Sequence, residues 1–585
     1  MANLKRVVLS ALRQMIIESF GDQIGEDFDP STIEVTQSTQ PQFGHYQTNF
    51  AMKMSKQLRQ NPKKIAEKLL EAFDGETYSA LESMDVKGPG FINITLKSTF
   101  LSQAINALSK DAQLGIEPPT KKEKVIVEFS SPNVAKELHV GHLRSTIIGE
   151  SIARLFEFLG HDVLRLNHIG DWGTQFGMLI HYLKTREESV LKGEKEATLS
   201  QLMGWYRSAK ALFDKDPDFK KASQQEVVAL QGGDKVALGA WKRICAISSR
   251  GFNSIYALLD VSGQERGESF YNRYLAKMVQ IFEDKGLLEV SDGAKCVFLE
   301  GFKNKEGDPL PLILQKSDGG YNYATTDVAA LYHRVNEEKA DRIIYVVDSG
   351  QSLHFQMIFA ACKKAGILDE KKVRVEHVPF GVVLGEDGKK FKTRSGKTEK
   401  LIDLLTEAVS RASKVLAERM DSPKPGEVEV LGKVLGLDAI KYADLSCHRI
   451  KDYVFSYDKM LKFEGNTAAY LLYSYVRIQG IKRKIQNVEK LLEGAEITLE
   501  HPSETALALH LLRFGESLQM MDKDLLPNRL TDYLYDLAEA FHAFFRDCHV
   551  QGSEHEASRL KLCVITASML EQGMQILGMK TLDKM

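Results

Sequence analysis

Three consecutive segments between residues 125 and 166 constrain the fold of this chain more than any other feature. Val125–Phe129 is a mostly apolar run, typical of a buried strand. From about Gly141 to Leu159 apolar residues recur at helical spacing, and Gly160 stops that helix. Val163–Leu166 is a second apolar strand. Strand, helix and strand in this order predict a βαβ unit on a parallel sheet.

The same alternation returns later in the chain. Arg342–Val347 and Val378–Leu384 are expected to be further strands of the sheet. The residues between the early and late strands, roughly 175–315, are mostly helical and polar in pattern and suit an insertion into the sheet domain. From about 427 to the end, apolar residues recur almost only at helical spacing, which predicts a helical bundle.

The residues before the sheet form a separate module. Helical patterns around Leu4–Phe20, Asn49–Leu58 and Pro62–Phe73 precede an alternating strand, Phe91–Leu96. Prolines and charges follow at 116–124, as expected of a linker. For a chain of 585 residues we therefore predict three domains. They are an N-terminal α+β domain (1–118), an α/β parallel-sheet domain with its insertion (119–426) and a C-terminal α-helical domain (427–585).

Composition excludes several classes of protein. With 77 Lys plus Arg against 79 Asp plus Glu, no basic excess points to nucleic acid. The six cysteines are scattered without C-x-x-C spacing, so we expect neither a disulfide framework nor a structural metal. We find no signal peptide and no apolar run long enough to span a membrane. A cytoplasmic protein without a membrane partner is expected.

The residues between the first strand and the helix carry the strongest chemical signal. Ser130–His142 ends in His139-Val140-Gly141-His142, where the chain enters the helix. A helix N-terminus attracts phosphate, glycine allows a close backbone approach, and two imidazoles can bond phosphate oxygens in a transition state. The alternative is that the two histidines only cap the helix.

A second segment concentrates positive charge between glycines. Gly385–Gly396 contains Lys389, Lys390, Lys392 and Arg394. Flexible cations of this kind can close over a triphosphate and neutralise the leaving pyrophosphate. An ordinary solvated basic loop is the alternative. We favour the first interpretation because the segment follows an apolar strand expected at the same edge of the sheet as the histidines.

These motifs resemble the class I aminoacyl-tRNA synthetases, whose signature is His-Ile-Gly-His after the first strand. The longer string from Ser131 to Gly149 is similar to the arginyl members in particular. The resemblance covers nearly the whole chain, and further matching segments are 167–177, 321–327 and 347–351. It implies a Rossmann-like catalytic domain that uses ATP, brought in with Mg²⁺, to activate L-arginine and transfer it to the 3′ end of tRNA(Arg).

The resemblance also implies roles for individual residues. The charge-stabilising (catalytic) set is Lys136, His139, His142, Lys390, Lys392 and Arg394, and the ATP-binding set is His139, Gly141, His142, Lys389, Lys390 and Lys392. Arg394 stands where the family's Lys-Met-Ser-Lys-Ser loop has its second lysine. Arginyl enzymes commonly depart in this way, and Lys136, just before the histidine signature, is the residue expected to compensate.

A guanidinium group needs a pocket of carboxylates and carbonyls that accept its forked donors. By resemblance the arginine-binding residues are Glu128, Ser130, Asn133, Tyr323, Asp327 and Gln351, with Tyr323 and Asp327 facing the guanidinium. The alternative for Glu128 is a strand-end carboxylate paired with a structural Lys or Arg. The alternative for Tyr323 and Gln351 is a purely structural role.

The partners implied are L-arginine, ATP and tRNA(Arg), bound by a monomer. The resemblance makes the C-terminal helices an anticodon-binding bundle, in which Tyr470 or Tyr473 either stacks on bases or packs in the core. It assigns the N-terminal module, with Gln42–Asn49, to the tRNA elbow. Two other functions stay open: a non-catalytic tRNA-binding paralogue, and a nucleotidyltransferase for small substrates with a His-x-Gly-His site.

Overall fold

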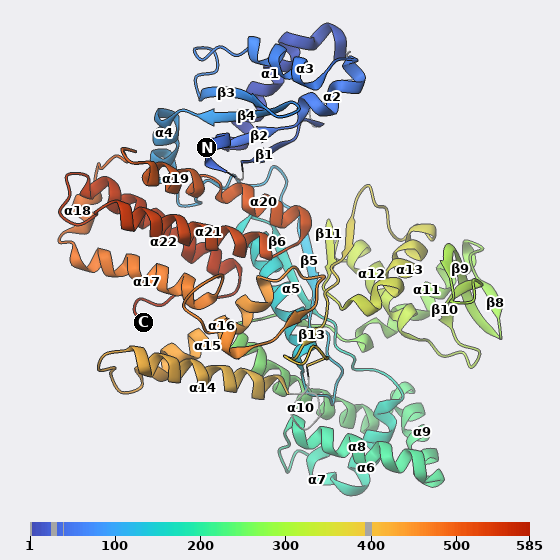
Figure 1. The fold of residues 1–585 in the computed structure, drawn as a ribbon. Helices are drawn as coiled ribbons and strands as arrows, with labels where there is room; N and C mark the ends of the chain where they lie inside the picture. The colour runs from blue at the N-terminus through green and yellow to red at the C-terminus, as the bar shows by residue number, and fades with distance from the viewer. Residues whose placement is uncertain (1–2, 25–31, 39, 392–399) are drawn as a thin grey trace.

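A computed structural model describes residues 3–24, 32–38, 40–391 and 400–585. Its central element is a five-stranded sheet in the order β12-β11-β5-β6-β7, in which every neighbouring pair is parallel. The strands are β5 (Lys124–Glu128), β6 (Asp162–Asn167), β7 (Gln264–Glu265), β11 (Arg342–Tyr345) and β12 (Arg374–His377). The predicted parallel sheet is confirmed (Figure 1).

Alternate side chains of β5 enter two different cores. Val125 and Val127 pack with α5 (Val140–Phe158) on one face of the sheet. Ile126 packs on the other face with α12 (Tyr323–Asn336) and α13 (Ser352–Lys364). All three β5 side chains are fully buried, which explains why the strand reads as an apolar run.

The predicted strand over Val378–Leu384 is wrong. The sheet uses Arg374–His377 instead, and only Val383–Leu384 is extended, as β13. β13 pairs in parallel with β14 (Tyr453–Val454) in a separate two-stranded sheet. Pro379 has no N–H to give to a ladder, and its carbonyl accepts a bond from Arg449. Val378 and Phe380 are apolar because they pack in the core that contains α5.

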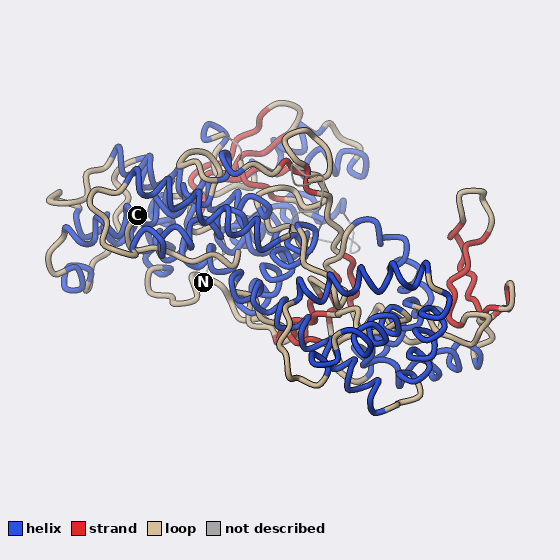
Figure 2. The backbone as a smooth tube through the Cα atoms, turned by 90° about the horizontal axis from the view of Figure 1, so that it is seen from below, coloured by secondary structure: helices blue, strands red, loops and turns tan. Residues whose placement is uncertain are grey.

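The insertion is not continuous, because β7 brings the chain back to β6 between two lobes. The first lobe is helical, as predicted: α6 (Gln175–Arg186), α7 (Glu188–Leu191), α8 (Leu199–Lys215), α9 (Pro217–Gln231) and α10 (Lys235–Leu259). The second has η3 (Glu268–Tyr271) and α11 (Asn272–Asp284), then an antiparallel sheet of β8 (Glu289–Ser291), β9 (Ala294–Lys303) and β10 (Pro309–Gln315). This sheet, which the sequence pattern did not predict, projects from one end of the molecule (Figure 2).

The N-terminal module is an α+β unit, as expected. It consists of α1 (Leu4–Ile24), β1 (Val35–Gln37), η2 (Pro41–Phe43), β2 (Tyr46–Thr48), α2 (Phe50–Leu58), α3 (Pro62–Glu71), β3 (Leu81–Lys87), β4 (Phe91–Leu96) and α4 (Ser98–Leu108). Its sheet has the order β1-β2-β4-β3. Tyr46 is fully buried and donates to Glu516 in α20 at 2.5 Å. Part of the segment assigned to the tRNA elbow is therefore an internal contact.

Helices make up nearly all of the C-terminal part. They are α14 (Leu401–Arg419), α15 (Glu427–Leu445), α16 (Tyr457–Met460), α17 (Ala468–Lys484), α18 (Val488–Leu492), α19 (Pro502–Leu511), α20 (Phe514–Asp524), α21 (Asn528–Asp547) and α22 (Glu556–Ile576). β14 is the one departure from the helical pattern in the described part of this region. No helix among the described residues is long and apolar enough to cross a membrane.

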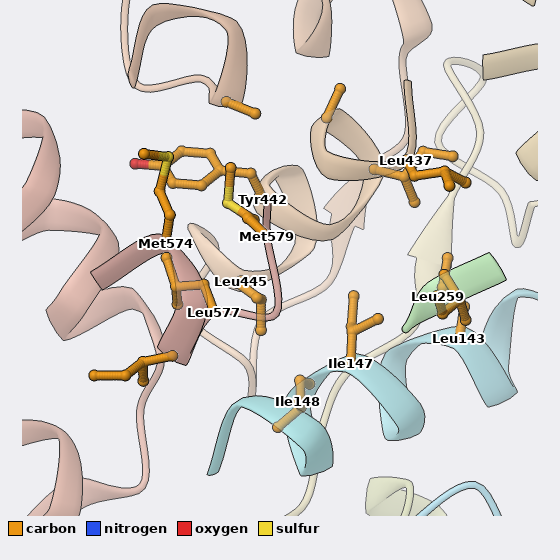
Figure 3. Packing of buried hydrophobic residues seen from close by; sticks show 14 of the residues in the cluster. Leu143, Ile147, Ile148, Leu259, Leu437, Tyr442, Leu445, Met574, Leu577 and Met579 are labelled. Carbon is orange, nitrogen blue, oxygen red and sulfur yellow. The ribbon is translucent and has the colours of Figure 1, made fainter. Parts of the chain in front are cut away.

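Helix α5 joins the sheet to the helical bundle. Its residues Ile147 and Ile148 lie toward Leu445 of α15 and Leu577 after α22, whereas Leu143 lies toward Leu259 of α10 (Figure 3). Two residues after His142, buried Arg144 pairs with Asp444 of α15 at 3.0 Å and donates to the carbonyl of Gly381 at 2.7 Å. The element that begins with the histidines is therefore fixed on several sides.

Candidate active site

The segment that follows β5 is held in an unusual backbone conformation. Ser130, Ser131 and Ala135 all have positive φ angles, of 70°, 49° and 60°. The backbone N–H of Ser130 donates to Ser145 Oγ at 2.8 Å, and that of Ala135 donates to Ser248 Oγ at 3.1 Å. Three strained non-glycine residues persist only where neighbours fix them, and such runs concentrate at functional sites.

His139, Gly141 and His142, named here the histidine corner, cap α5. His139 is the N-cap, and its Nδ1 accepts from the N–H of Gly141 at 3.1 Å. Nδ1 of His142 accepts in turn from the N–H of His139 at 3.1 Å. A neutral ring that accepts at Nδ1 carries its hydrogen on Nε2. The capping alternative is thus correct as structure, and it leaves both rings with an Nε2–H donor for a ligand.

Both rings of the histidine corner are biased toward the neutral form. Burial lowers the pKa of His142 to about 3, with His139 and Lys136 adding to the effect. The pKa of His139 is also lowered, first by burial and then by Lys136. At neutral pH the rings are therefore hydrogen-bond donors without a net charge.

The residue at position 141 is glycine for a steric reason that the sequence did not reveal. A Cβ there would lie 2.9 Å from Cε1 and 3.1 Å from Nδ1 of His139. The missing side chain lets the His139 ring fold against the first turn of α5. The glycine of the motif shapes the position of its own histidine.

The start of the cationic segment and a residue beyond its end both make defined contacts. Its first part is a tight turn, in which the N–H of Gly385 donates to the carbonyl of Lys389 at 2.8 Å and Lys390 bridges back to Leu384. Four residues beyond Gly396, Lys400 forms a β-bridge with His139, and its ammonium group pairs with Glu137 at 2.7 Å.

These contacts differ from the expectation that the cationic segment follows a strand at the same edge of the sheet as the histidines. The segment follows the short strand β13, which lies outside the five-stranded sheet, and Lys400, which comes after the segment, contacts the histidine corner. Lys389 and Lys390 are exposed. Lys392 and Arg394 lie outside the described residues.

A group of carboxylates, named here the acidic slot, is formed by Asp171, Glu268 and Asp327. Asp171 is buried and accepts from the N–H and the hydroxyl of Ser269 at 2.8 and 2.6 Å. Glu268 begins η3, directly after β7. Burial raises its pKa to about 8, and the charges of Asp327 and Asp171 add to the shift. Carboxyl groups crowded in this way favour a cationic ligand.

Asp327 lies on α12 and makes a close contact with α13. Its Oδ2 is 2.6 Å from Nε2 of His354. Seven residues later on α12, buried Arg334 forms an ion pair with Glu128 at the end of β5. The alternative for Glu128, a pair with a structural arginine, is therefore what the structure has. A direct contact of Glu128 with a ligand stays a prediction.

The other predicted arginine-binding residues come from the same edge of the sheet. Ser130 is buried, with its Oγ 2.7 Å from Oη of Tyr256. Asn133 follows β5 and bridges to Gly170, where a Cβ would lie 2.2 Å from its Oδ1. Tyr323 begins α12 and is 73% exposed. Gln351 ends η4 (Ser349–Gln351) and donates to Asp348 at 2.9 Å.

Sequence reasoning missed Glu268 and His354. Glu268 follows a strand of two residues, which is too short to give a pattern. His354 lies three residues beyond the end of the matching segment 347–351, so the residues next to that segment could have pointed to it. Among the described residues, no three or more His, Cys, Asp or Glu side chains are grouped to hold a metal ion. The expectation of no resident metal stays a prediction.

Strand order explains why these residues converge. From β5 the chain passes to β6 on one side, while β11 lies on its other side. The segments after β5 and β11 therefore part from each other at the carboxyl edge, where open α/β sheets bind their ligands. A nucleotide-binding type of sheet, a histidine-capped helix and an acidic slot define the catalytic domain of a class I aminoacyl-tRNA synthetase.

Comparison with known families agrees with this class and narrows it. The model described as "tRNA synthetases class I (R), catalytic domain" matches residues 103–457. An "Arginyl tRNA synthetase N terminal domain" matches residues 2–96, and a "DALR anticodon binding domain" matches 471–585. The chain belongs to the arginyl-tRNA synthetase family.

Individual relatives cover the whole chain. An "Arginine--tRNA ligase" of Protochlamydia amoebophila is 56% identical over 100% of both chains. One of Picosynechococcus is 48% identical over 99% of this chain and 100% of its own. The solved arginyl-tRNA synthetase of Plasmodium falciparum has a TM-score of 0.86 at 36% identity and covers 100% of both chains.

The fold is also that of the Thermus thermophilus arginyl-tRNA synthetase, with a TM-score of 0.79 at 24% identity over 100% of both chains. The predicted fold class and family are confirmed. The chain is an aminoacyl-tRNA ligase that uses ATP, specifically an arginine–tRNA ligase. A non-catalytic paralogue and a small-substrate nucleotidyltransferase are not favoured.

Proposed function

We propose that the histidine corner and the cationic segment hold the triphosphate of ATP while the carboxylate of L-arginine attacks the α-phosphate. The observation that carries this assignment is the pair of Nε2–H donors left after both Nδ1 atoms accept backbone hydrogen bonds. Neutral donors fixed before the reaction stabilise developing negative charge without transferring a proton.

The cations Lys136, Lys389, Lys390, Lys392 and Arg394 would then neutralise the leaving pyrophosphate. The contact of Lys400 with Glu137 and His139 supports this role, because it holds a residue only four positions after the segment beside the corner. Gly141 would allow ATP to approach the first turn of α5. Mg²⁺ would arrive with ATP as part of the substrate and bridge its phosphate oxygens.

The acidic slot would bind the guanidinium group of arginine. Asp327 and Tyr323 would face that group, and Glu268 would add a second carboxylate that ionises when the cation enters. Ser130, Asn133 and Gln351 would hold the amino-acid end. Glu128 would act chiefly through Arg334, whose ion pair fixes the helix that carries Asp327.

In the second step the terminal adenosine hydroxyl of tRNA(Arg) would attack the arginyl-adenylate. An exposed cluster on the bundle would contact the anticodon: Arg477 lies 4.8 Å from the ring centre of Tyr473 and 5.1 Å from that of Phe545. Tyr470 is less available, because it donates to Glu539 and packs near His542. We further propose a cytoplasmic monomer with the predicted domains 1–118, 119–426 and 427–585.

ATP–pyrophosphate exchange with each amino acid, with and without tRNA(Arg), tests this assignment. We expect exchange with arginine alone among the amino acids. Changing Lys136 or Lys389 to Gln should then lower kcat and leave the KM for arginine unchanged. Exchange that prefers no amino acid would contradict guanidinium binding by the acidic slot. Unchanged rates in both lysine variants would contradict the role of the cations in neutralising pyrophosphate.

A further inference from the structure

Asp327 is held by a residue that none of the roles above uses. Nε2 of His354 lies 2.6 Å from Oδ2 of Asp327, and the two side chains are 28% and 21% exposed. They come from different helices, α13 and α12. At this distance the contact is a charge-assisted hydrogen bond, provided that Nε2 carries a hydrogen.

The contact occupies one oxygen of the carboxylate and leaves the other available. Among the residues that the structure describes, Oδ1 of Asp327 has no hydrogen-bond partner. The His354 ring lies in the first turn of α13 and packs against Phe355 at 5.6 Å. A ring fixed on a helix can thus hold the carboxylate in one orientation.

The surroundings of Asp327 show what such a contact does. Asp327 and Asp171 both act electrostatically on Glu268 in the acidic slot, and Asp327 has the larger effect. The side chain of Asp327 is 21% exposed, so without a restraint it can rotate away from the slot and toward water. A hydrogen bond from His354 opposes this rotation before the substrate cation is present.

We propose that His354 is a positioning residue that turns the free oxygen of Asp327 toward the side chain of the substrate and so sets the affinity for arginine. The inference rests on the proposed function, in which Asp327 binds the guanidinium group. A carboxylate oriented in advance loses less freedom when the guanidinium binds, and the gain is specific to that substrate.

The test is steady-state aminoacylation of tRNA(Arg) by the full chain carrying His354→Leu or His354→Gln. Leucine removes the donor, whereas the glutamine amide can restore an N–H at similar reach. We expect His354→Leu to raise the KM for arginine about tenfold, as for loss of one charge-assisted hydrogen bond. The KM for ATP and the melting temperature should stay unchanged, and His354→Gln should recover most of the arginine affinity.

His181→Leu is the matched control, because His181 is also a half-buried helical histidine packed against an aromatic ring, Phe219 at 4.9 Å, but lies in the helical lobe. It should leave both KM values unchanged. Equal changes in the two KM values for His354→Leu, or no recovery with glutamine, would overturn the positioning role.

Asp327→Ala separates this inference from the function on which it rests. If Asp327→Ala raises the KM for arginine and His354→Leu does not, Asp327 binds the substrate without help from His354, and the inference is wrong. If neither variant changes that KM, the proposed guanidinium site is wrong as well.

Discussion

The histidine corner and the acidic slot lie at the same edge of one sheet and are prepared for opposite charges. In the corner, burial lowers the pKa of His142 to about 3 and keeps a base neutral. In the slot, burial raises the pKa of Glu268 to about 8 and keeps an acid neutral. Burial therefore shifts the pKa in both places, and in each it favours the neutral form of the side chain.

The difference lies in what happens when the ligand arrives. The histidines keep their neutral Nε2–H donors throughout, since a phosphate needs only fixed donors and nearby cations. The carboxyl group of Glu268 must ionise, because a guanidinium group requires a counter-charge. The corner needs no change of protonation when its ligand binds, whereas the slot must still ionise Glu268.

Removing a hydrogen-bond donor from the histidine corner is the strongest test of this comparison. His142→Ala should lower the rate of activation by about 10²–10³, the usual cost of losing one transition-state donor. The melting temperature should fall by less than about 4 °C, because only one capping bond is lost. Rapid-quench activation and thermal unfolding measure the two. A large loss of stability with normal turnover would show that His142 is only structural.

On the slot side, Asp327→Asn keeps the size of the side chain and removes its charge. We expect the KM for arginine to rise about 100-fold, as for loss of a hydrogen-bonded charge, while the KM for ATP changes less than about threefold. Steady-state aminoacylation at varied arginine and varied ATP gives both values. Equal effects on the two substrates would contradict the guanidinium role.

A smaller change tests the geometry of the corner alone. Gly141→Ala places a Cβ 2.9 Å from Cε1 of His139, so the ring must shift by a few tenths of an ångström. We expect kcat to fall about tenfold, as small displacements of a donor do, with the KM for arginine unchanged. Gly204→Ala is the control, because nothing lies within 4 Å of a Cβ at that helical position. Equal rates in both variants would contradict a positional role for the glycine.

The smallest effect is a pH dependence that belongs to the slot. Below its pKa of about 8, Glu268 is mostly neutral in the empty slot, so arginine binding must ionise it. The KM for arginine should therefore fall about fivefold as the pH rises from about 7.2 to 8.5, and Glu268→Gln should flatten this slope. The KM for ATP in the same buffers is the control. An unchanged slope in Glu268→Gln would assign the dependence to another group.

The sequence predicted the helices and strands whose burial leaves a regular apolar pattern within the segment itself. β5, α5 and the helices of the bundle were found because their burial imposes a regular apolar pattern. The predicted strand over Val378–Leu384 was wrong because Val378 and Phe380 are buried in the core that contains α5, although neither belongs to a strand. An apolar run cannot distinguish these two causes.

The two parts of the site also differ in how far they could be predicted from the sequence. The histidine corner is contiguous in the chain, so its motif was visible. The acidic slot joins residues from three distant segments, and Glu268 reaches it through a strand of two residues. The pairing of Glu128 with Arg334 spans 206 residues and could not be distinguished from ligand binding before the fold was known.

The contact between Tyr46 and Glu516 has a consequence for synthesis of the chain. The two residues are 470 positions apart, so the N-terminal module leaves the ribosome long before the helix that covers Tyr46 exists. At typical elongation rates that interval is about 25–90 seconds. Throughout it the nascent module presents an uncovered face, and chaperones have their opportunity to bind there.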